Sequence, residues 1–269
     1  MSPLSAAAEV WTTSPLVEVA ALLFGLLVGS FANVCIHRIP REESLVRPPS
    51  RCPSCGAPVR PLDNVPVLSW LWLGGRCRSC RAPISPRYPA VEAANGLLWM
   101  ALVAWRGLTL QTLVAMCLVT ALLVLSLIDL DHHLLPNVIT LPGIAVGLLA
   151  TLLPRSALTH LESAAAALGG YLAFLLVAKG YQKARGIEGL GQGDWKMAAM
   201  LGAFLGWQKM LLTVFVASLV GTAVGLGLIV FGGRDSRHAL PFGTFLGAAG
   251  ILVVFVGEPL VAWYRGLFE

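Results

Sequence analysis

Long, uncharged apolar runs separated by short polar segments dominate the chain. A membrane-spanning helix needs about 20 predominantly apolar residues, and eight runs approach or reach that length, so we predict eight helices. The runs cover residues 19–36, 93–105, 107–128, 138–153, 163–178, 197–207, 210–233 and 239–257. The second gains length from the residues around Glu92, and the eighth can continue past Glu258 to Trp263. The sixth is too short to span alone, and lipid tolerates such a segment only where other helices bury it or where it lines a wet cavity.

The composition supports the same conclusion. With 57% hydrophobic and 12% charged residues in a chain of 269, an ordinary soluble domain is excluded. We therefore predict an all-α polytopic membrane protein with about eight transmembrane helices. The long polar stretch after the first run is expected to form a small cytoplasmic module. The expected domains are a first transmembrane helix (1–40), the module (41–87) and a transmembrane core (88–269).

The basic residues predict the orientation. Nine of the 19 Lys and Arg residues lie between the first and second helices, against three acidic residues, and an excess of this kind is typical of cytoplasmic loops. The nine are Arg38, Arg41, Arg47, Arg51, Arg60, Arg76, Arg78, Arg81 and Arg87. No Lys or Arg precedes Arg38, so we do not expect a cleavable signal peptide. The net charge of +5 is then explained by topology and contact with anionic lipid, and no nucleic-acid partner is expected.

Four cysteines in the polar stretch are spaced as metal ligands. Cys52 and Cys55 form one C-x-x-C pair, and Cys77 and Cys80 form a second pair about 20 residues later. This spacing predicts a structural zinc site, because each pair offers two sulfurs to one tetrahedral ion. Disulfides are the weaker interpretation, since a cytoplasmic loop lies in a reducing compartment. We expect the site to fold the module and to do no chemistry, because all four positions are filled.

Two aspartates fall at the same predicted membrane edge. Asp194 follows glycines at positions 189, 191 and 193, which let the backbone pack closely on a neighbouring helix or an extended peptide. Asp129 ends the third helix. Asp194 could act only as a helix N-cap, yet ionisable residues in membrane segments are rare and usually mark a site. Asp131 could be the reactive acid in place of Asp129. His132 and His133 are adjacent, point in different directions on a helix and are expected to be solvated.

A pair of facing carboxylates could catalyse peptide hydrolysis. Like charges in close contact cannot both ionise, so the pair shares a proton; one member activates water while the other protonates the peptide carbonyl. The general alternative is an ion or proton path, here a transporter with a zinc-stabilised cytoplasmic cap. A transporter should show repeats or paired broken helices, and the sequence shows one broken segment.

The order of the short motifs resembles that of the type IV prepilin peptidases, the bifunctional leader peptidases and N-methyltransferases of pilus and type II secretion systems. The motifs that carry the resemblance are Gly29-Ser30-Phe31-x-Asn33-Val34-x-Ile36-x-Arg38-x-Pro40, the two cysteine pairs, Tyr88-Pro89-x-Val91-Glu92, Ile128-Asp129-x-Asp131-His132-x-Leu134-Leu135-Pro136, Glu188-Gly189-x-Gly191-x-Gly193-Asp194-x-Lys196, and Pro241-Phe242-Gly243.

This resemblance implies that Asp129 and Asp194 are the catalytic pair, the second in a G-x-G-D motif. It implies cleavage of a prepilin or pseudopilin leader after glycine at the cytoplasmic edge of the bacterial inner membrane. It also implies methylation of the new N-terminus from S-adenosylmethionine, whose pocket we expect near Glu92 and the turn at Gly74 and Gly75. The cysteine module favours the bifunctional form.

Three positions depart from the family pattern. Asn137 stands where many members carry aspartate, Ala32 replaces a common leucine, and Thr244 stands where proline is usual. None of these is expected to touch the two aspartates.

Overall fold

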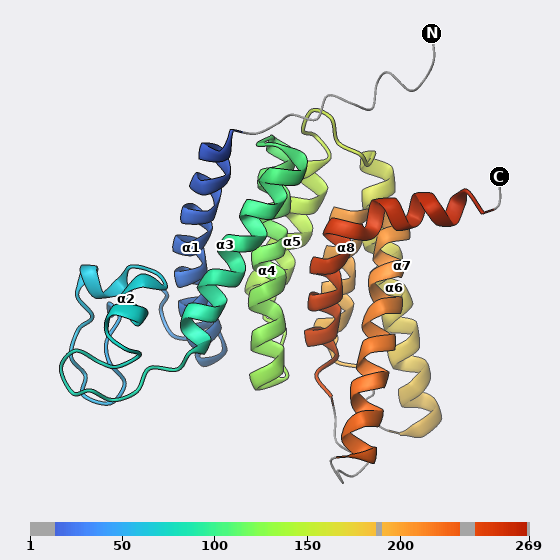
Figure 1. Ribbon diagram of the computed structural model, residues 1–269. Helices are drawn as coiled ribbons and strands as arrows, with labels where there is room; N and C mark the ends of the chain where they lie inside the picture. The colour runs from blue at the N-terminus through green and yellow to red at the C-terminus, as the bar shows by residue number, and fades with distance from the viewer. Residues whose placement is uncertain (1–13, 187–189, 232–239, 268–269) are drawn as a thin grey trace. The chain divides into compact units, whose positions relative to one another are not determined.

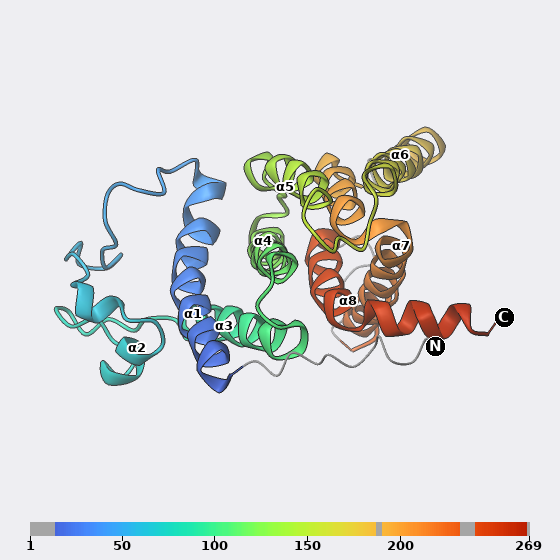
Figure 2. The same cartoon turned by 90° about the horizontal axis from the view of Figure 1, so that it is seen from above.

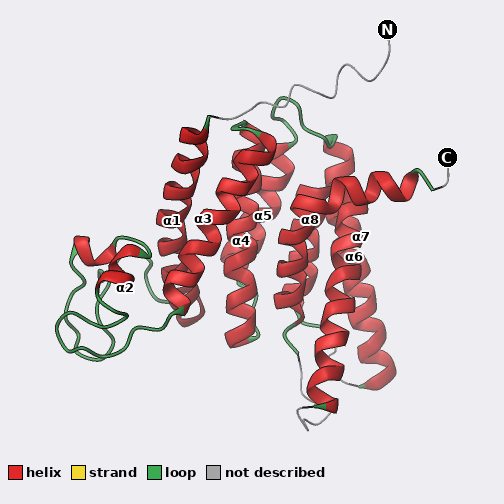
Figure 3. Cartoon of the chain, in the orientation of Figure 1, coloured by secondary structure: helices red, strands yellow, loops and turns green. Residues whose placement is uncertain are grey.

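The computed structural model describes residues 14–186, 190–231 and 240–267, and within them it is helical with no extended strand (Figure 3). Eight α-helices and two 3-10 turns follow one another along the described chain (Figure 1). They are α1 (Pro15–Arg38), η2 (Ile39–Arg41), η3 (Pro61–Asn64), α2 (Leu68–Trp72), α3 (Arg87–Arg106), α4 (Leu110–His132), α5 (Asn137–Ala150), α6 (His160–Arg185), α7 (Gln192–Val230) and α8 (Phe242–Arg265). Glu188 and Gly189 of the predicted G-x-G-D region lie outside the described residues.

Five of these helices are long and apolar enough to cross a membrane: α1, α4, α6, α7 and α8. The chain is therefore a multi-pass membrane protein, while the predicted count of eight spans is not confirmed. The runs 197–207 and 210–233 both fall in α7, which is interrupted where Gly206 adopts φ 74° and ψ 172°. α8 continues past Glu258 to Arg265, as predicted, with Pro259 inside it.

Residues 1–35 and 44–116 form the first of two compact units. In this unit α1 packs so closely on α3 that there is no room for a side chain at two glycines. A Cβ on Gly25 would lie 2.8 Å from Gly96 Cα, and one on Gly29 would lie 2.8 Å from Glu92 Cα. Close approach of helices through small residues is typical of membrane proteins. Asn33 Nδ2 of α1 donates to the Tyr88 carbonyl of α3 at 3.0 Å, as expected for an amide in an apolar helix, which can hydrogen-bond to a neighbouring helix.

The polar module in this unit contains two similar knuckles. Residues 51–61 and 76–86 read RCPSCGAPVRP and RCRSCRAPISP, and each closes with an antiparallel bridge, Arg51 with Pro58 and Arg76 with Pro83. In both copies the residue after the second cysteine has left-handed backbone: Gly56 has φ 70° and Arg81 has φ 60°. The repeat therefore presents two equivalent cysteine pairs.

Residues 36–43 and 117–269 form the second unit. Here α7 contacts α5, α6 and α8, as the view from above shows (Figure 2). The first half of α7 supplies much of the core, since Met197, Met200 and Leu201 are fully buried. Ser163 Oγ of α6 donates to the Ala203 carbonyl of α7 at 2.7 Å. Cysteines in apolar helices are expected to be buried; Cys35 is buried, whereas Cys117 of α4 is exposed, contrary to this expectation.

Candidate active site and metal centre

Asp129 lies in the last turn of α4, and its side chain is buried, with 6% exposed. Its Oδ2 accepts the backbone N–H of Thr244 at 2.7 Å and lies 3.3 Å from Thr244 Oγ1. The Thr244 hydroxyl also lies 3.1 Å from the Ser126 carbonyl oxygen, so it can donate its one proton either to that carbonyl or to Asp129 Oδ2. Thr244 is in the first turn of α8, where backbone N–H groups have no partner in the helix. Asp129 therefore caps α8 from a different helix.

Asp194 lies in the first turn of α7 and is also buried, with 8% exposed. Its Oδ2 accepts the Gly191 N–H at 3.0 Å, so Asp194 caps its own helix from the third helical position. The simple N-cap alternative is thus partly correct, although the N-cap residue is Gly191. Both carboxylates face helix N-termini, where the helix dipole stabilises negative charge. The two carboxyl groups lie close enough for their charges to interact.

Leu135 packs against the starts of both α7 and α8. A Cβ on Gly193 would lie 2.6 Å from Leu135 Cβ, and a Cβ on Gly243 would lie 2.8 Å from Leu135 Cδ1 and 2.9 Å from Asp129 Oδ2. Any side chain at either glycine would have to displace Leu135. Gly193 therefore allows close packing within the protein, which is one of the two roles that its position in the sequence suggested.

The residues beside Asp129 are exposed. Asp131, His132 and His133 are all exposed, in contrast to the buried Asp129. A proton-sharing pair needs a site shielded from water, so burial favours Asp129 over Asp131 as the partner of Asp194. The histidines are solvated, as predicted.

Three contacts in this region were not predicted from the sequence. Thr244 was not expected to touch the aspartates, and this expectation was wrong, because Thr244 donates to Asp129. Tryptophan is typical of membrane interfaces, but Trp195 is only 9% exposed and packs edge-on against Tyr171, with ring centroids 6.1 Å apart. Lys196 Nζ donates to Asn137 Oδ1 at 2.7 Å, so the unusual asparagine contacts the residue two positions after Asp194.

Thr244 gives a test of how Asp129 is held. The substitution Thr244→Val keeps the backbone N–H and the side-chain volume but removes the hydroxyl. Because a hydrogen bond to a charged group contributes about 1.5–3 kcal/mol and the main-chain donor remains, we expect turnover to fall by roughly tenfold. The measurement is the rate of leader removal by purified Thr244→Val, with Thr213→Val as a control for loss of a buried hydroxyl elsewhere in the unit. Equal rates for wild type and Thr244→Val would show that the hydroxyl does not position Asp129.

The four module cysteines form one cluster. Their sulfur atoms all lie within 4.8 Å of one another, with Cys52 Sγ to Cys80 Sγ at 3.8 Å and Cys55 Sγ to Cys77 Sγ at 4.0 Å. Four thiolates at about 2.3 Å from a tetrahedral zinc ion are about 3.8 Å apart, so the cluster fits zinc. The short contacts pair a cysteine of one knuckle with a cysteine of the other. These distances are far from the roughly 2.05 Å of a disulfide.

Hydrogen bonds and one ion pair within the module set the protonation of its cysteines and hold its segments together. Backbone N–H groups of Cys55 and Ser54 lower the pKa of the Cys52 thiol to about 6. The Ala57 backbone N–H lowers the pKa of the Cys55 thiol, but hydrogen bonds to the other cysteines outweigh it and raise that pKa to about 11. Of these two thiols, Cys52 is therefore the one whose metal-binding thiolate form is favoured. Arg78, in the second knuckle, forms a bidentate pair with Asp63 of η3, with Nη2 to Oδ1 at 2.6 Å and Nε to Oδ2 at 2.8 Å. This pair lowers the pKa of Asp63 and fixes η3 against the knuckle.

Glu92 of α3 connects the module to the helices. It is 8% exposed, its Oε2 accepts the Val67 N–H at 2.7 Å, and it also hydrogen-bonds the Ser30 side chain of α1. Val67 precedes α2 and has φ 62°, a strained conformation for a β-branched residue. Glu92 therefore accepts a hydrogen bond from the residue that precedes α2.

Comparison with known proteins places both regions in one family. A sequence model of the bacterial peptidase A24 N-terminal domain matches residues 23–106, and one of the type IV leader peptidase family matches residues 116–226. The first match contains the cysteine module and Glu92, and the second contains Asp129 and Asp194. No solved structure gives a significant match.

Curated relatives cover nearly the whole chain. A protein of Aeromonas hydrophila is 39% identical over 266 residues, covering 90% of this chain and 91% of its own. A protein of Pseudomonas aeruginosa is 39% identical over 267 residues with the same coverage, and one of Pseudomonas putida is 39% identical over 271 residues. Each is named prepilin leader peptidase/N-methyltransferase. At this identity and coverage, the chain belongs to the type IV leader peptidase family.

Proposed function

We propose that this protein removes the leader peptide of type IV prepilins or pseudopilins with Asp129 and Asp194 as its catalytic pair, and then methylates the new N-terminus. The observation that carries the peptidase proposal is the pair of buried, interacting carboxylates at the starts of α7 and α8. The names of the relatives support both the substrate class and the two activities. The transporter alternative gains no support from the family.

The hydrogen bonds to the two carboxylates suggest which one is charged and which one carries the shared proton. Asp129 has a main-chain donor and a hydroxyl at its Oδ2, while Asp194 has a single main-chain donor. Donors stabilise the charged form of a carboxylate, so we assign the negative charge to Asp129 and the shared proton to Asp194. Asp129 then takes a proton from the attacking water. Asp194 protonates the carbonyl oxygen of the scissile bond as water adds to the carbon. When the C–N bond then breaks, Asp129 gives its proton to the leaving amine nitrogen and Asp194 takes one back from a hydroxyl of the gem-diol intermediate.

The proposed substrate suits this position. A prepilin leader is short and basic, and a membrane helix follows it, so the scissile bond lies near the cytoplasmic interface. The ends of α4 and α7 that carry the aspartates are expected at that interface in the bacterial inner membrane, with the cysteine module on the cytoplasmic side. Incubating the purified protein with a prepilin in membranes and measuring the loss of leader mass tests the activity.

The second activity requires a methyl donor, and we propose S-adenosylmethionine. The donor is charged and soluble, so it must arrive from the cytoplasm, where the module is expected. A Cβ on Gly74 would meet nothing within 4 Å, which leaves that backbone open to a ligand, whereas Gly75 packs on Trp70. Glu92 is buried and already bonded to Val67, so we expect it to position the nearby loop and not to touch the donor.

The two activities should be separable. Hydrolysis needs an activated water and a proton donor, whereas methyl transfer needs a neutral amine held in line with a sulfonium methyl group, which is mainly a matter of positioning. We therefore expect Asp194→Asn to keep methylating a synthetic, already-cleaved pilin N-terminus at a rate within about twofold of wild type, because the step needs no shared proton. The measurement is incorporation of labelled methyl into that peptide. Methylation lost together with cleavage, in folded protein, would mean one shared site.

A further inference from the structure

The short helix α2 presents a strongly apolar face to its surroundings. Leu68 is 64% exposed, Leu71 is 60% exposed and Trp72 is 87% exposed. Residues three and four apart share one face of a helix, so these side chains form a single patch. The opposite side of α2 faces the module, where Trp70 Nε1 donates to the Ile84 carbonyl at 3.0 Å. We call Leu68, Leu71 and Trp72 the α2 face.

The α2 face is held at the level of the membrane helices of its unit. Val67, immediately before α2, donates its N–H to Glu92 in the second turn of α3. In Figures 1 and 3, α2 lies beside the lower turns of α1 and α3 and not beyond their ends. Both neighbouring helix ends carry basic residues, Arg38 on α1 and Arg87 on α3. Basic residues at helix ends mark the membrane edge, so the α2 face lies at that edge.

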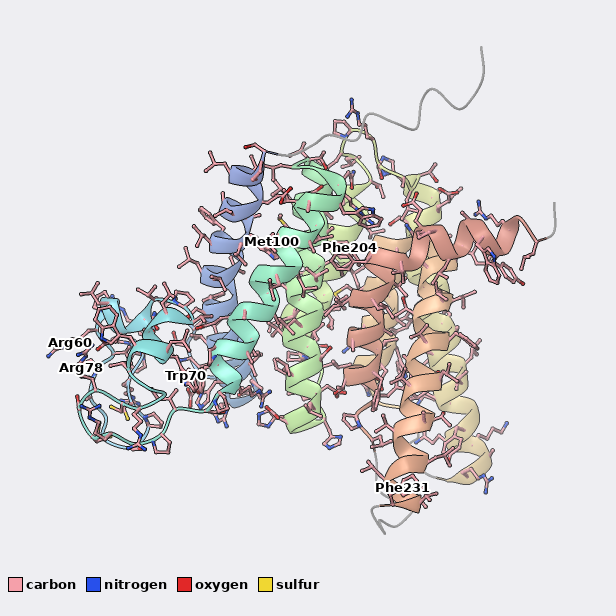
Figure 4. All side chains as sticks on the ribbon, viewed as in Figure 1. Arg60, Trp70, Arg78, Met100, Phe204 and Phe231 are labelled. Atoms are coloured by element: carbon pink, nitrogen blue, oxygen red, sulfur yellow. The ribbon has the colours of Figure 1, made fainter. Side chains whose placement is uncertain are left out.

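The charge around α2 matches an anionic surface. Residues 44–86 contain six arginines and one acidic residue, Asp63, which pairs with Arg78. Figure 4 shows Arg60 and Arg78 on the outer side of the module and Trp70 on the side toward α3. The exposed arginines are Arg47, Arg51, Arg60, Arg76, Arg78 and Arg81. Each basic group near an anionic membrane surface contributes favourably to binding.

We propose that α2 is an interfacial membrane anchor, with Leu68, Leu71 and Trp72 in the headgroup–acyl boundary of anionic lipid. A tryptophan with this exposure is costly in water, and tryptophan is enriched at membrane interfaces because its ring is apolar and its N–H is polar. The arginines of the module lie against lipid phosphates. Because Glu92 ties Val67 to α3, the anchor fixes the module at one depth in the bilayer edge.

Lipid photo-crosslinking tests this placement on the full-length protein. Benzoylphenylalanine replaces Trp72 in one variant and Ser54, an exposed residue between the cysteines of the first knuckle, in a second variant. Both are incorporated into nanodiscs of phosphatidylglycerol and phosphatidylethanolamine and irradiated, and adducts are identified by mass spectrometry. We expect several-fold more lipid adduct at position 72 than at position 54. Adding Leu68→Asp and Leu71→Asp should lower the yield at position 72 by a similar factor.

Other results would reject the anchor. Equal lipid yields at positions 72 and 54, or a product at position 72 that joins two copies of the chain, would overturn the proposal. Equal yields from nanodiscs of phosphatidylcholine would overturn its anionic-lipid part. Trp72 makes no buried contact that folding depends on, since it is 87% exposed. The metal content and thiol reactivity of each variant verify that the module is intact.

Discussion

Replacing Asp129 or Asp194 by asparagine is expected to lower the rate of leader removal by at least about a hundredfold and up to about ten-thousandfold, the range for loss of a positioned acid or base. Asparagine has the same shape but can neither share the proton nor take one from water. At Asp194 it can still accept the Gly191 N–H that caps α7, so the helix should remain intact. The measurement is a leader-removal assay on purified variants in membranes.

Asp131→Asn is the matched control for Asp129→Asn. It makes the same chemical change two residues later in α4, at an exposed position. We expect it to keep much of the wild-type rate. Full activity of Asp194→Asn would refute the aspartyl mechanism, and loss of activity in Asp131→Asn alone would move the first acid by two residues. Circular dichroism of all three variants in detergent separates chemistry from misfolding.

Local sequence patterns predicted the features that depend on neighbouring residues. The apolar runs predicted the helices, although the two runs at 197–207 and 210–233 fall in one helix, α7, that is interrupted at Gly206. The C-x-x-C spacing predicted the sulfur cluster, because two such pairs can present four sulfurs to one ion. Asn33 was assigned correctly because an amide in an apolar helix needs a partner on a neighbouring helix.

Contacts between distant segments could not be predicted from these patterns. Thr244 lies 115 residues from Asp129, and nothing in the spacing of either motif indicates that the start of α8 meets the end of α4. Trp195 looked like an interfacial anchor by residue type, yet its place in the first turn of α7 turns it toward Tyr171 of α6. The close packing at Gly193 also depends on a distant residue, since Leu135 occupies the space that a side chain at position 193 would need.

Removing the metal from the cysteine cluster should unfold the module while the helices stay folded. The free energy of structural zinc binding to such sites is on the order of 10 kcal/mol and is also the free energy of local folding. Besides a few hydrogen bonds, the module has no apolar core in its helices: α2 and η3 have five and four residues, and neither contains a buried residue. The helices of the second unit pack through their own fully buried side chains, such as Leu122 and Met200, and do not depend on the ion.

The experiment compares Cys80→Ser with Cys117→Ser. Cys80 Sγ lies in the cluster, whereas Cys117 is an exposed thiol on α4, so the second variant makes the same chemical change outside the site. Wild type and Cys117→Ser should each carry about one zinc per chain under reducing conditions, and Cys80→Ser should carry almost none. Hydrogen exchange should accelerate in residues 44–86 of Cys80→Ser and stay unchanged in α4–α8. Wild-type protein with free thiols and no bound metal would reject the zinc site, and slow exchange in a metal-free module would show that the fold of the knuckles rests on their hydrogen bonds alone.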